Sequence, residues 1–228
     1  AFLWDAWRSD GSAGAGSNPF PREVVARLDP TARALAARLV AEPCNRSVTQ
    51  QLTAQLGAMA EYRSVIRLEA AFRERCGPDE QLLPHLFAAQ MRSSEFLSAR
   101  GTAELIIQYF SADPNAWSWR AEVREQLGDY AGALADYRQA LGRFQDPSRV
   151  AASVHYAAAQ VAARAGQPCE AALLMRDYLA FDPLARRTQQ INTVMREWQV
   201  AGQCRPPFGS GRAALRFDRR EGATVSYT

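Results

Sequence analysis

Residues 113–141 read DPNAWSWRAEVREQLGDYAGALADYRQAL, a stretch that predicts two helices joined by a tight turn. Asp113-Pro114 is typical of a helix start, since proline has no backbone N–H to lose at the first helical position. Gly128 permits the turn because glycine adopts positive φ without steric cost. The small residues Ala121 and Ala133 let the two helices approach closely. The stretch therefore predicts a closely packed helical hairpin.

The spacing of residues within this hairpin resembles that of the tetratricopeptide repeat family. The residues that match are Trp117, Ala121, Gly128-Asp129-Tyr130, Ala133, Tyr137 and Ala140. Two positions depart from the family pattern: Arg124 stands where a large apolar or aromatic residue is usual, and the closing Pro147 comes two places late. The resemblance implies stacked hairpins whose first helices line a concave groove for a peptide.

The remainder of residues 21–205 is rich in Ala, Leu, Arg, Glu and Gln at helical spacing. Ser153–Pro183 matches the repeat more weakly, and Ala99 lies one repeat length of the family before Ala133. The sequence therefore predicts an all-α domain, a tetratricopeptide-like helical-hairpin solenoid with a short C-terminal β-hairpin or strand extension. Breaks between helices are expected near Asp29-Pro30, Pro43, Gly57, Gly77-Pro78, Ser93, Asp113-Pro114, Gly128, Pro147, Gly166 and Asp182-Pro183.

Four cysteines lie beside expected helix ends. Cys44 and Cys169 each follow a proline typical of a helix start, whereas Cys76 and Cys204 lie where Gly or Pro would end a helix. The chain from Cys44 to Cys76, and likewise from Cys169 to Cys204, is long enough for two antiparallel helices and a turn. We therefore predict the disulfides Cys44–Cys76 and Cys169–Cys204, which indicate an oxidising compartment. Four buried free thiols in a cytosolic protein are the competing interpretation.

The two ends differ in composition from the helical domain. Residues 1–20 place Phe2, Leu3, Trp4 and Trp7 before a stretch rich in Gly, Ser and Pro, predicted to be a flexible N-terminal segment. The aromatic part either docks on the repeat surface or lies in the groove. Residues 206–228 predict a linker followed by two strands that turn near residues 219–222. This hairpin is a possible start of a further β domain.

The order of helical repeats and a terminal hairpin resembles that of bacterial exported proteins with a retropepsin-like aspartic protease domain. The Asp-Thr/Ser-Gly motif of that family does not occur in the chain, where the nearest string is Asp10-Gly11-Ser12. The resemblance implies that these residues would be the regulatory or substrate-presenting part of such a protease. A domain containing the catalytic motif would then lie outside this chain.

Composition argues against several other functions. Net charge is only +3, all 27 basic residues are Arg, and lysine is absent, so neither a Schiff-base lysine nor a phosphate-loop lysine is possible. The arginines are scattered among 24 acids, which predicts no nucleic-acid partner. His85 and His155 lie far apart in the chain, and no catalytic motif is present. We predict no enzyme, cofactor or metal site, and no direct membrane insertion.

The expected function is binding of a protein or peptide partner, outside the cytoplasm. The chain is predicted to be periplasmic or secreted, with any signal peptide removed. In the hairpin of residues 113–141, four residues of the first helix are not expected to pack inward. The equivalent positions in the preceding and following hairpins add four more. Ordinary solvated helix faces are the competing interpretation of this set. The predicted groove residues are Arg92, Asn115, Ser118, Glu122, Glu125, Tyr156, Gln160 and Arg164.

Overall fold

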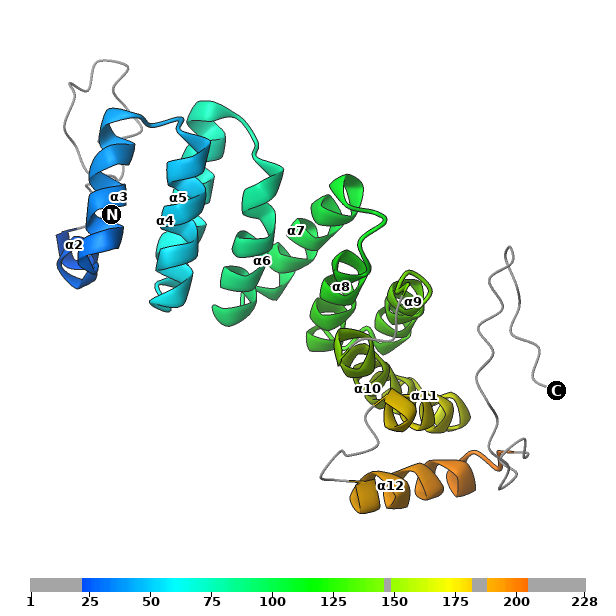
Figure 1. Ribbon diagram of the computed structural model, residues 1–228. Helices are drawn as coiled ribbons and strands as arrows, with labels where there is room; N and C mark the ends of the chain where they lie inside the picture. The colour runs from blue at the N-terminus through cyan, green and yellow to red at the C-terminus, as the bar shows by residue number, and fades with distance from the viewer. Residues whose placement is uncertain (1–21, 146–148, 182–187, 205–228) are drawn as a thin grey trace. The chain divides into compact units, whose positions relative to one another are not determined.

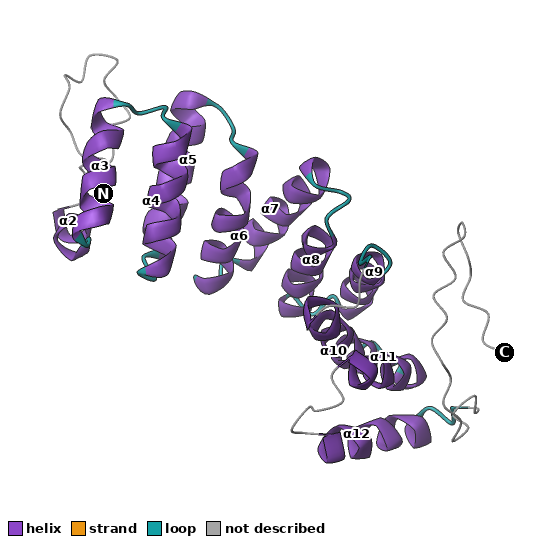
Figure 2. Cartoon of the chain, in the orientation of Figure 1, coloured by secondary structure: helices purple, strands orange, loops and turns teal. Residues whose placement is uncertain are grey.

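The computed structural model describes residues 22–145, 149–181 and 188–204, and its regular structure is helical throughout these ranges (Figure 2). The all-α prediction is confirmed for this part of the chain. The predicted β-hairpin, the linker before it and the N-terminal segment lie outside the described residues. The helices are α2 Arg22–Arg27, α3 Pro30–Ala41, α4 Arg46–Ala58, α5 Tyr62–Cys76, η1 Glu80–Leu82, α6 Leu83–Arg92, α7 Phe96–Tyr109, α8 Pro114–Gln126, α9 Tyr130–Leu141, α10 Arg149–Arg164, α11 Pro168–Phe181 and α12 Thr188–Ala201.

The chain divides into two compact units, residues 1–147 and residues 148–228. In the first unit each helix from α3 to α8 packs against the next along the chain (Figure 1). In the second unit α10 packs on α11, and α11 packs on α12. This packing between sequential neighbours is consistent with a helical repeat fold.

Three hairpins of the first unit begin in the same way, at evenly spaced positions. Asn45, Asp79 and Asp113 each precede a helix and accept a hydrogen bond from a backbone N–H two or three residues later, at 2.9 to 3.1 Å. Short polar side chains are favoured here because the first N–H groups of a helix have no partner within it. The caps therefore mark a regular repeat in the first unit.

The turns inside these hairpins recur with the same period. In these turns one residue has the left-handed backbone conformation: Ala60, Ser94 and Gly128, with φ of 59°, 60° and 79°. In each turn the N–H of the following residue donates to the carbonyl five residues earlier, at 2.9 Å, and the left-handed residue itself bonds three residues back. These two bonds are the Schellman arrangement that closes a helix C-terminus. Glycine occupies only one of the three positions.

Hydrophobic clusters follow one another along the described residues of the first unit. One is built mainly from α2 to α5, with Leu52 and Leu56 among the fully buried side chains. Another is built from α6 to α8 and includes Phe87, which stacks on Trp119 at 5.8 Å between ring centroids. Tyr137 is buried, as expected for a residue that fills the space between helices.

Trp117 is only half-buried and joins three segments of the first unit. Its Nε1–H donates to the carbonyl of Ser111 at 2.9 Å, and Arg143 Nε donates to the same oxygen at 3.0 Å. The Arg143 guanidinium carbon also lies 4.4 Å from the centre of the Trp117 ring. These contacts connect the loop before α8 with the residues that directly follow α9.

In the second unit, α10 and α11 form a hairpin with the same turn. Gly166 has φ of 73°, and the N–H of Gln167 donates to Ala162 O at 2.9 Å. A small core cluster in this unit has Ala159, Met175 and Ile191 as its buried members. Larger side chains pack around these three and remain half-buried: Tyr156, Leu174, Tyr178, Leu179, Met195 and Trp198.

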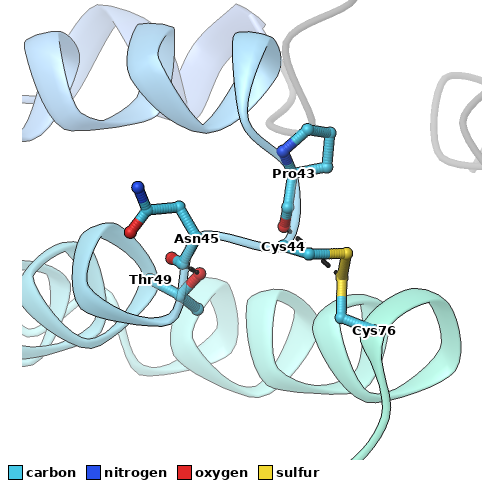
Figure 3. Close-up of a disulfide and its surroundings, with 5 residues drawn as sticks. All are labelled: Pro43, Cys44, Asn45, Thr49 and Cys76. Carbon is cyan, nitrogen blue, oxygen red and sulfur yellow. Dashed lines mark hydrogen bonds between the residues drawn. A yellow bond between two sulfur atoms is a disulfide. The ribbon is translucent and has the colours of Figure 1, made fainter.

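Both disulfides join the cysteines that their spacing predicts. Cys44 lies just before α4 and Cys76 is the last residue of α5, so the bond closes the open end of that hairpin, with Cα atoms 5.4 Å apart (Figure 3). Cys169 lies in the first turn of α11 and Cys204 follows α12, with Cα atoms 5.5 Å apart. Intact disulfides favour an oxidising, extracytoplasmic environment.

Candidate functional site

The first helices of the hairpins carry the predicted groove residues of the first unit. On α8, Asn115 and Ser118 are half-buried and bound locally. The Asn115 amide donates to Asp113 Oδ1 at 2.9 Å, and the Ser118 hydroxyl donates to the Pro114 carbonyl at 3.1 Å. These two side chains stabilise the start of α8, so a ligand would have to compete with these hydrogen bonds.

Farther along α8, the structure brings three predicted residues into one electrostatic group. Arg92, at the end of α6, and Glu122 are exposed, and Glu125 is half-buried. Partial shielding from water raises the pKa of Glu122, the Glu125 carboxylate raises it further, and Arg92 opposes both effects. The group therefore presents opposite charges from two neighbouring first helices.

The acidic part of the group occurs on α8 and has no counterpart at the equivalent positions of α4 and α6. Positions one and two periods before Glu122 hold Ala88 and Ala54, which are also exposed. The position of Glu122 is thus small and uncharged on α4 and α6 and becomes acidic on α8. Such a change of character along a helix face could select a partner by its charge.

In the second unit the predicted residues have different environments. Tyr156 packs inward against Tyr178, with ring centroids 5.2 Å apart in an edge-on arrangement, and belongs to the small core. Gln160 is half-buried, and Arg164 is exposed at the end of α10. Tyr156 therefore contributes to packing, and Arg164 is the most exposed residue of this set.

A shallow polar pocket of about 330 Å³ lies where two hairpin turns meet in the first unit. Its walls include Arg92 from the predicted set and Glu61, which is paired with Arg27 at 2.8 Å. Sequence reasoning missed this pocket because its walls come from the turns of two successive hairpins. The residues that line it are Ala60, Glu61, Tyr62, Arg63, Arg92 and Ser93.

A charged cluster inside the third hairpin was also missed. Arg120 donates two hydrogen bonds to the buried carboxylate of Asp136, at 2.8 and 2.7 Å, and Arg124 lies 2.8 Å from the same group. Arg124 also donates to the Gly132 carbonyl at 3.1 Å. Arg124 stands where the repeat family usually has a large apolar residue, and the carboxylate of Asp136 on the facing helix α9 neutralises its charge.

One histidine, His155 on α10, is half-buried. Burial lowers the pKa of the His155 imidazole below its usual range, and the Asp177 carboxylate partly opposes this shift. Across the described ranges, no three His, Cys, Asp or Glu side chains gather as a metal site would require. The arrangement of charges on α6 and α8 is suited to binding through ion pairs and hydrogen bonds.

Comparison with known proteins gave no match to a protein-family model and none to a curated protein. Within residues 22–145, 149–181 and 188–204, no helix combines the length and apolar character needed to cross a membrane. In the described part of the chain, the fold and disulfides therefore define a class only: helices that pack against their neighbours along the chain, with disulfides joining helix pairs.

Proposed function

We propose that this chain is a non-catalytic protein-interaction module of an extracytoplasmic protein, built as a tetratricopeptide-type solenoid. The observation that carries the proposal is the even recurrence of the caps at residues 45, 79 and 113 and of the turns at residues 60, 94 and 128. Both sets have the repeat length of that family, whose units also consist of two helices. Repeats of this kind bind extended or helical segments of other proteins.

The proposed binding face consists of the first helices α4, α6 and α8. Arg92 and Glu122 are its exposed charges of opposite sign, and Ala54 and Ala88 leave room for a polypeptide backbone beside them. A partner segment with both an acidic and a basic side chain would pair with these two groups. Partly shielded ion pairs favour a specific partner and orientation more than they add affinity.

Location outside the cytoplasm follows from the disulfides. A reducing cytosol would keep the four thiols free, whereas the periplasm or the extracellular space preserves such bonds. We place the protein in the periplasm or among secreted proteins. Mass analysis of the protein isolated from its own source, without reduction, should find no free thiol. Four free thiols would contradict this placement.

Selection of peptides from a display library on the immobilised full chain tests the binding function. We expect micromolar peptides whose affinity falls about tenfold or more, 1.4 kcal/mol, with Arg92→Glu or Glu122→Arg. Arg67→Glu reverses an exposed charge on the second helix α5 and serves as the matched control, with no expected effect. The proposal fails if no peptide binds, or if all three variants weaken binding equally.

The alternative is that the chain is the regulatory or substrate-presenting part of an exported retropepsin-like aspartic protease. It rests on the sequence resemblance of residues 206–228, which lie outside the described residues. Reading the coding sequence beyond Thr228 tests it directly. A downstream domain with an Asp-Thr-Gly motif would support the alternative, and a stop codon after Thr228 would exclude a protease domain in the same polypeptide.

A further inference from the structure

Helix α7 has an apolar stripe on its outer surface. Leu97, Leu105 and Tyr109 are 69%, 37% and 54% exposed, and they account for three of the five exposed large apolar side chains in the described part of the chain. Gly101 lies between them at the same helical spacing, with open space where a Cβ would be. Residues four apart lie on one helix face, so these four residues form a continuous stripe.

The hairpin repeat does not require this stripe. One period earlier, on α5, the positions of Leu97 and Gly101 hold the exposed residues Arg63 and Arg67. One period later, on α9, they hold the exposed residues Ala131 and Ala135. A contiguous apolar patch that neighbouring repeats lack is a mark of an interaction surface.

We propose that the chain's own N-terminal segment, Phe2–Trp7, docks on the stripe. This segment carries Phe2, Leu3, Trp4 and Trp7, the densest group of large apolar side chains next to the helical domain. Burying aromatic side chains against Leu and Tyr removes apolar surface of both partners from water. Asp5 and Arg8 would meet counter-charges in Arg100 and Glu104, which are exposed beside the stripe.

The position of α2 puts the stripe within reach of the segment. Arg27 at the end of α2 pairs with Glu61 at the start of α5, 2.8 Å away. Glu61 lines the same pocket as Ser93, and Leu97 lies only four residues beyond Ser93. The start of α2 is about 9 Å from its end, since a helix rises 1.5 Å per residue. Residues 8–20, when extended, span up to about 45 Å. This is longer than the path from the start of α2, past Glu61, to Leu97.

Photo-crosslinking in the full chain tests the proposal, with p-benzoylphenylalanine in place of Leu3. We expect crosslinks within the same chain to residues 96–109, at a yield independent of protein concentration. Leu97→Glu should lower the yield about tenfold, because a charge replaces buried apolar surface. Ala131→Glu, at the equivalent exposed position of α9, should leave the yield unchanged.

Three results would overturn the proposal: crosslinks directed to α4, α6 or α8, crosslinks joining two copies of the chain, or no crosslinks at all. Both substitutions are at exposed helix positions, and circular dichroism would verify that the variants fold. The experiment uses no external partner, and the stripe lies on a second helix. Its outcome is therefore independent of whether the first-helix face binds a peptide.

Discussion

Arg124 lies 2.8 Å from the buried carboxylate of Asp136, and one period earlier the same two positions hold Gln90 and Thr102, joined by a 2.8 Å hydrogen bond. Two periods earlier they hold Leu56 and Leu68, both buried in the hydrophobic core. The site between the two helices of a hairpin is thus apolar in the first hairpin, hydrogen-bonded in the second and ionic in the third. Each solution satisfies its buried groups.

We predict that Asp136→Ala destabilises the protein by about 3 kcal/mol, because it leaves the Arg120 and Arg124 guanidiniums without their acid. This value is at the lower end for a broken buried pair, since the two arginine side chains are 18% and 24% exposed. Urea unfolding followed by circular dichroism would measure the loss.

The first hairpin supplies the control for this variant. Arg120, Arg124 and Asp136 correspond to Leu52, Leu56 and Leu68, so a triple change to Leu reproduces a packing that the chain already uses. Replacing a buried ionic cluster by apolar residues of similar volume is often neutral or stabilising. The triple variant should therefore unfold at a urea concentration equal to or above that of the wild type. A triple variant less stable than Asp136→Ala would refute the equivalence of the hairpins.

The disulfide at the open end of the α4–α5 hairpin should stabilise that hairpin strongly. Closing a loop of 32 residues lowers the entropy of the unfolded chain, which corresponds to about 3.7 kcal/mol. We expect Cys44→Ser with Cys76→Ser to lose most of this value, and hydrogen exchange should accelerate first at the amides of α4 and α5. If exchange accelerated only in α11 and α12, the bond would not have this local role.

Most of the fold could be predicted from the sequence because glycine, proline and short polar side chains mark the helix ends. Gly128 and Gly166 lie in their turns as expected. The α4–α5 turn was expected near Gly57, but its left-handed residue is Ala60, because the hairpin repeat and not the residue's own preference sets that conformation. The partner of Arg124 was missed because one helix alone does not reveal what faces it.

The candidate site was harder to predict than the fold. Register arguments put Arg92 and Glu122 in one set, and the structure brings the two charges into one electrostatic group. The same arguments did not anticipate the packing of Tyr156 on Tyr178 in the small core. An aromatic side chain on a half-buried helix face can turn either way, and only the neighbouring helix decides which. The stripe on α7 could be recognised only from the three-dimensional structure, which shows which side chains of the helix are exposed.

The turn residues Ala60 and Ser94 predict a gain in stability on substitution by glycine. A non-glycine residue in the left-handed region costs roughly 1–2 kcal/mol. Glycine avoids this cost, but it also makes the unfolded chain more flexible, which cancels part of the gain. We therefore expect Ala60→Gly and Ser94→Gly each to raise the free energy of unfolding by about 0.5–1 kcal/mol. Thermal unfolding would measure the change.

The matched control is Ala58→Gly, two residues before Ala60 and at the last helical residue of α4. There glycine gains nothing from positive φ and loses helix propensity, so stability should fall by about 0.5–1 kcal/mol. Opposite signs at Ala58 and Ala60 would verify the turn geometry. A loss at both positions would show that Ala60 does not adopt the left-handed conformation in solution.

Glu69 predicts a pH dependence of stability with a defined sign. Its side chain is buried on α5, and burial raises the pKa of its carboxyl above the ordinary 4.5, with Arg73 partly opposing the shift from 3.6 Å. The folded state therefore binds the proton of Glu69 more tightly than the unfolded state does. As the pH rises from the pKa of Glu69 in the unfolded chain through its raised pKa in the folded protein, the free energy of unfolding falls. At neutral pH the charged carboxylate is a net cost.

Replacing this group by a neutral amide should remove the cost. We expect Glu69→Gln to be more stable than the wild type at pH 7, with the difference shrinking as the pH is lowered through the titration of Glu69, because the protonated acid and the amide are then alike. The lost ion pair with the exposed Arg73 should matter little. Urea unfolding at several pH values, with Glu74→Gln on the exposed face of α5 as the control, would measure the difference. A Glu69→Gln variant less stable than the wild type at pH 7 would mean that the carboxylate is well paired inside the folded protein.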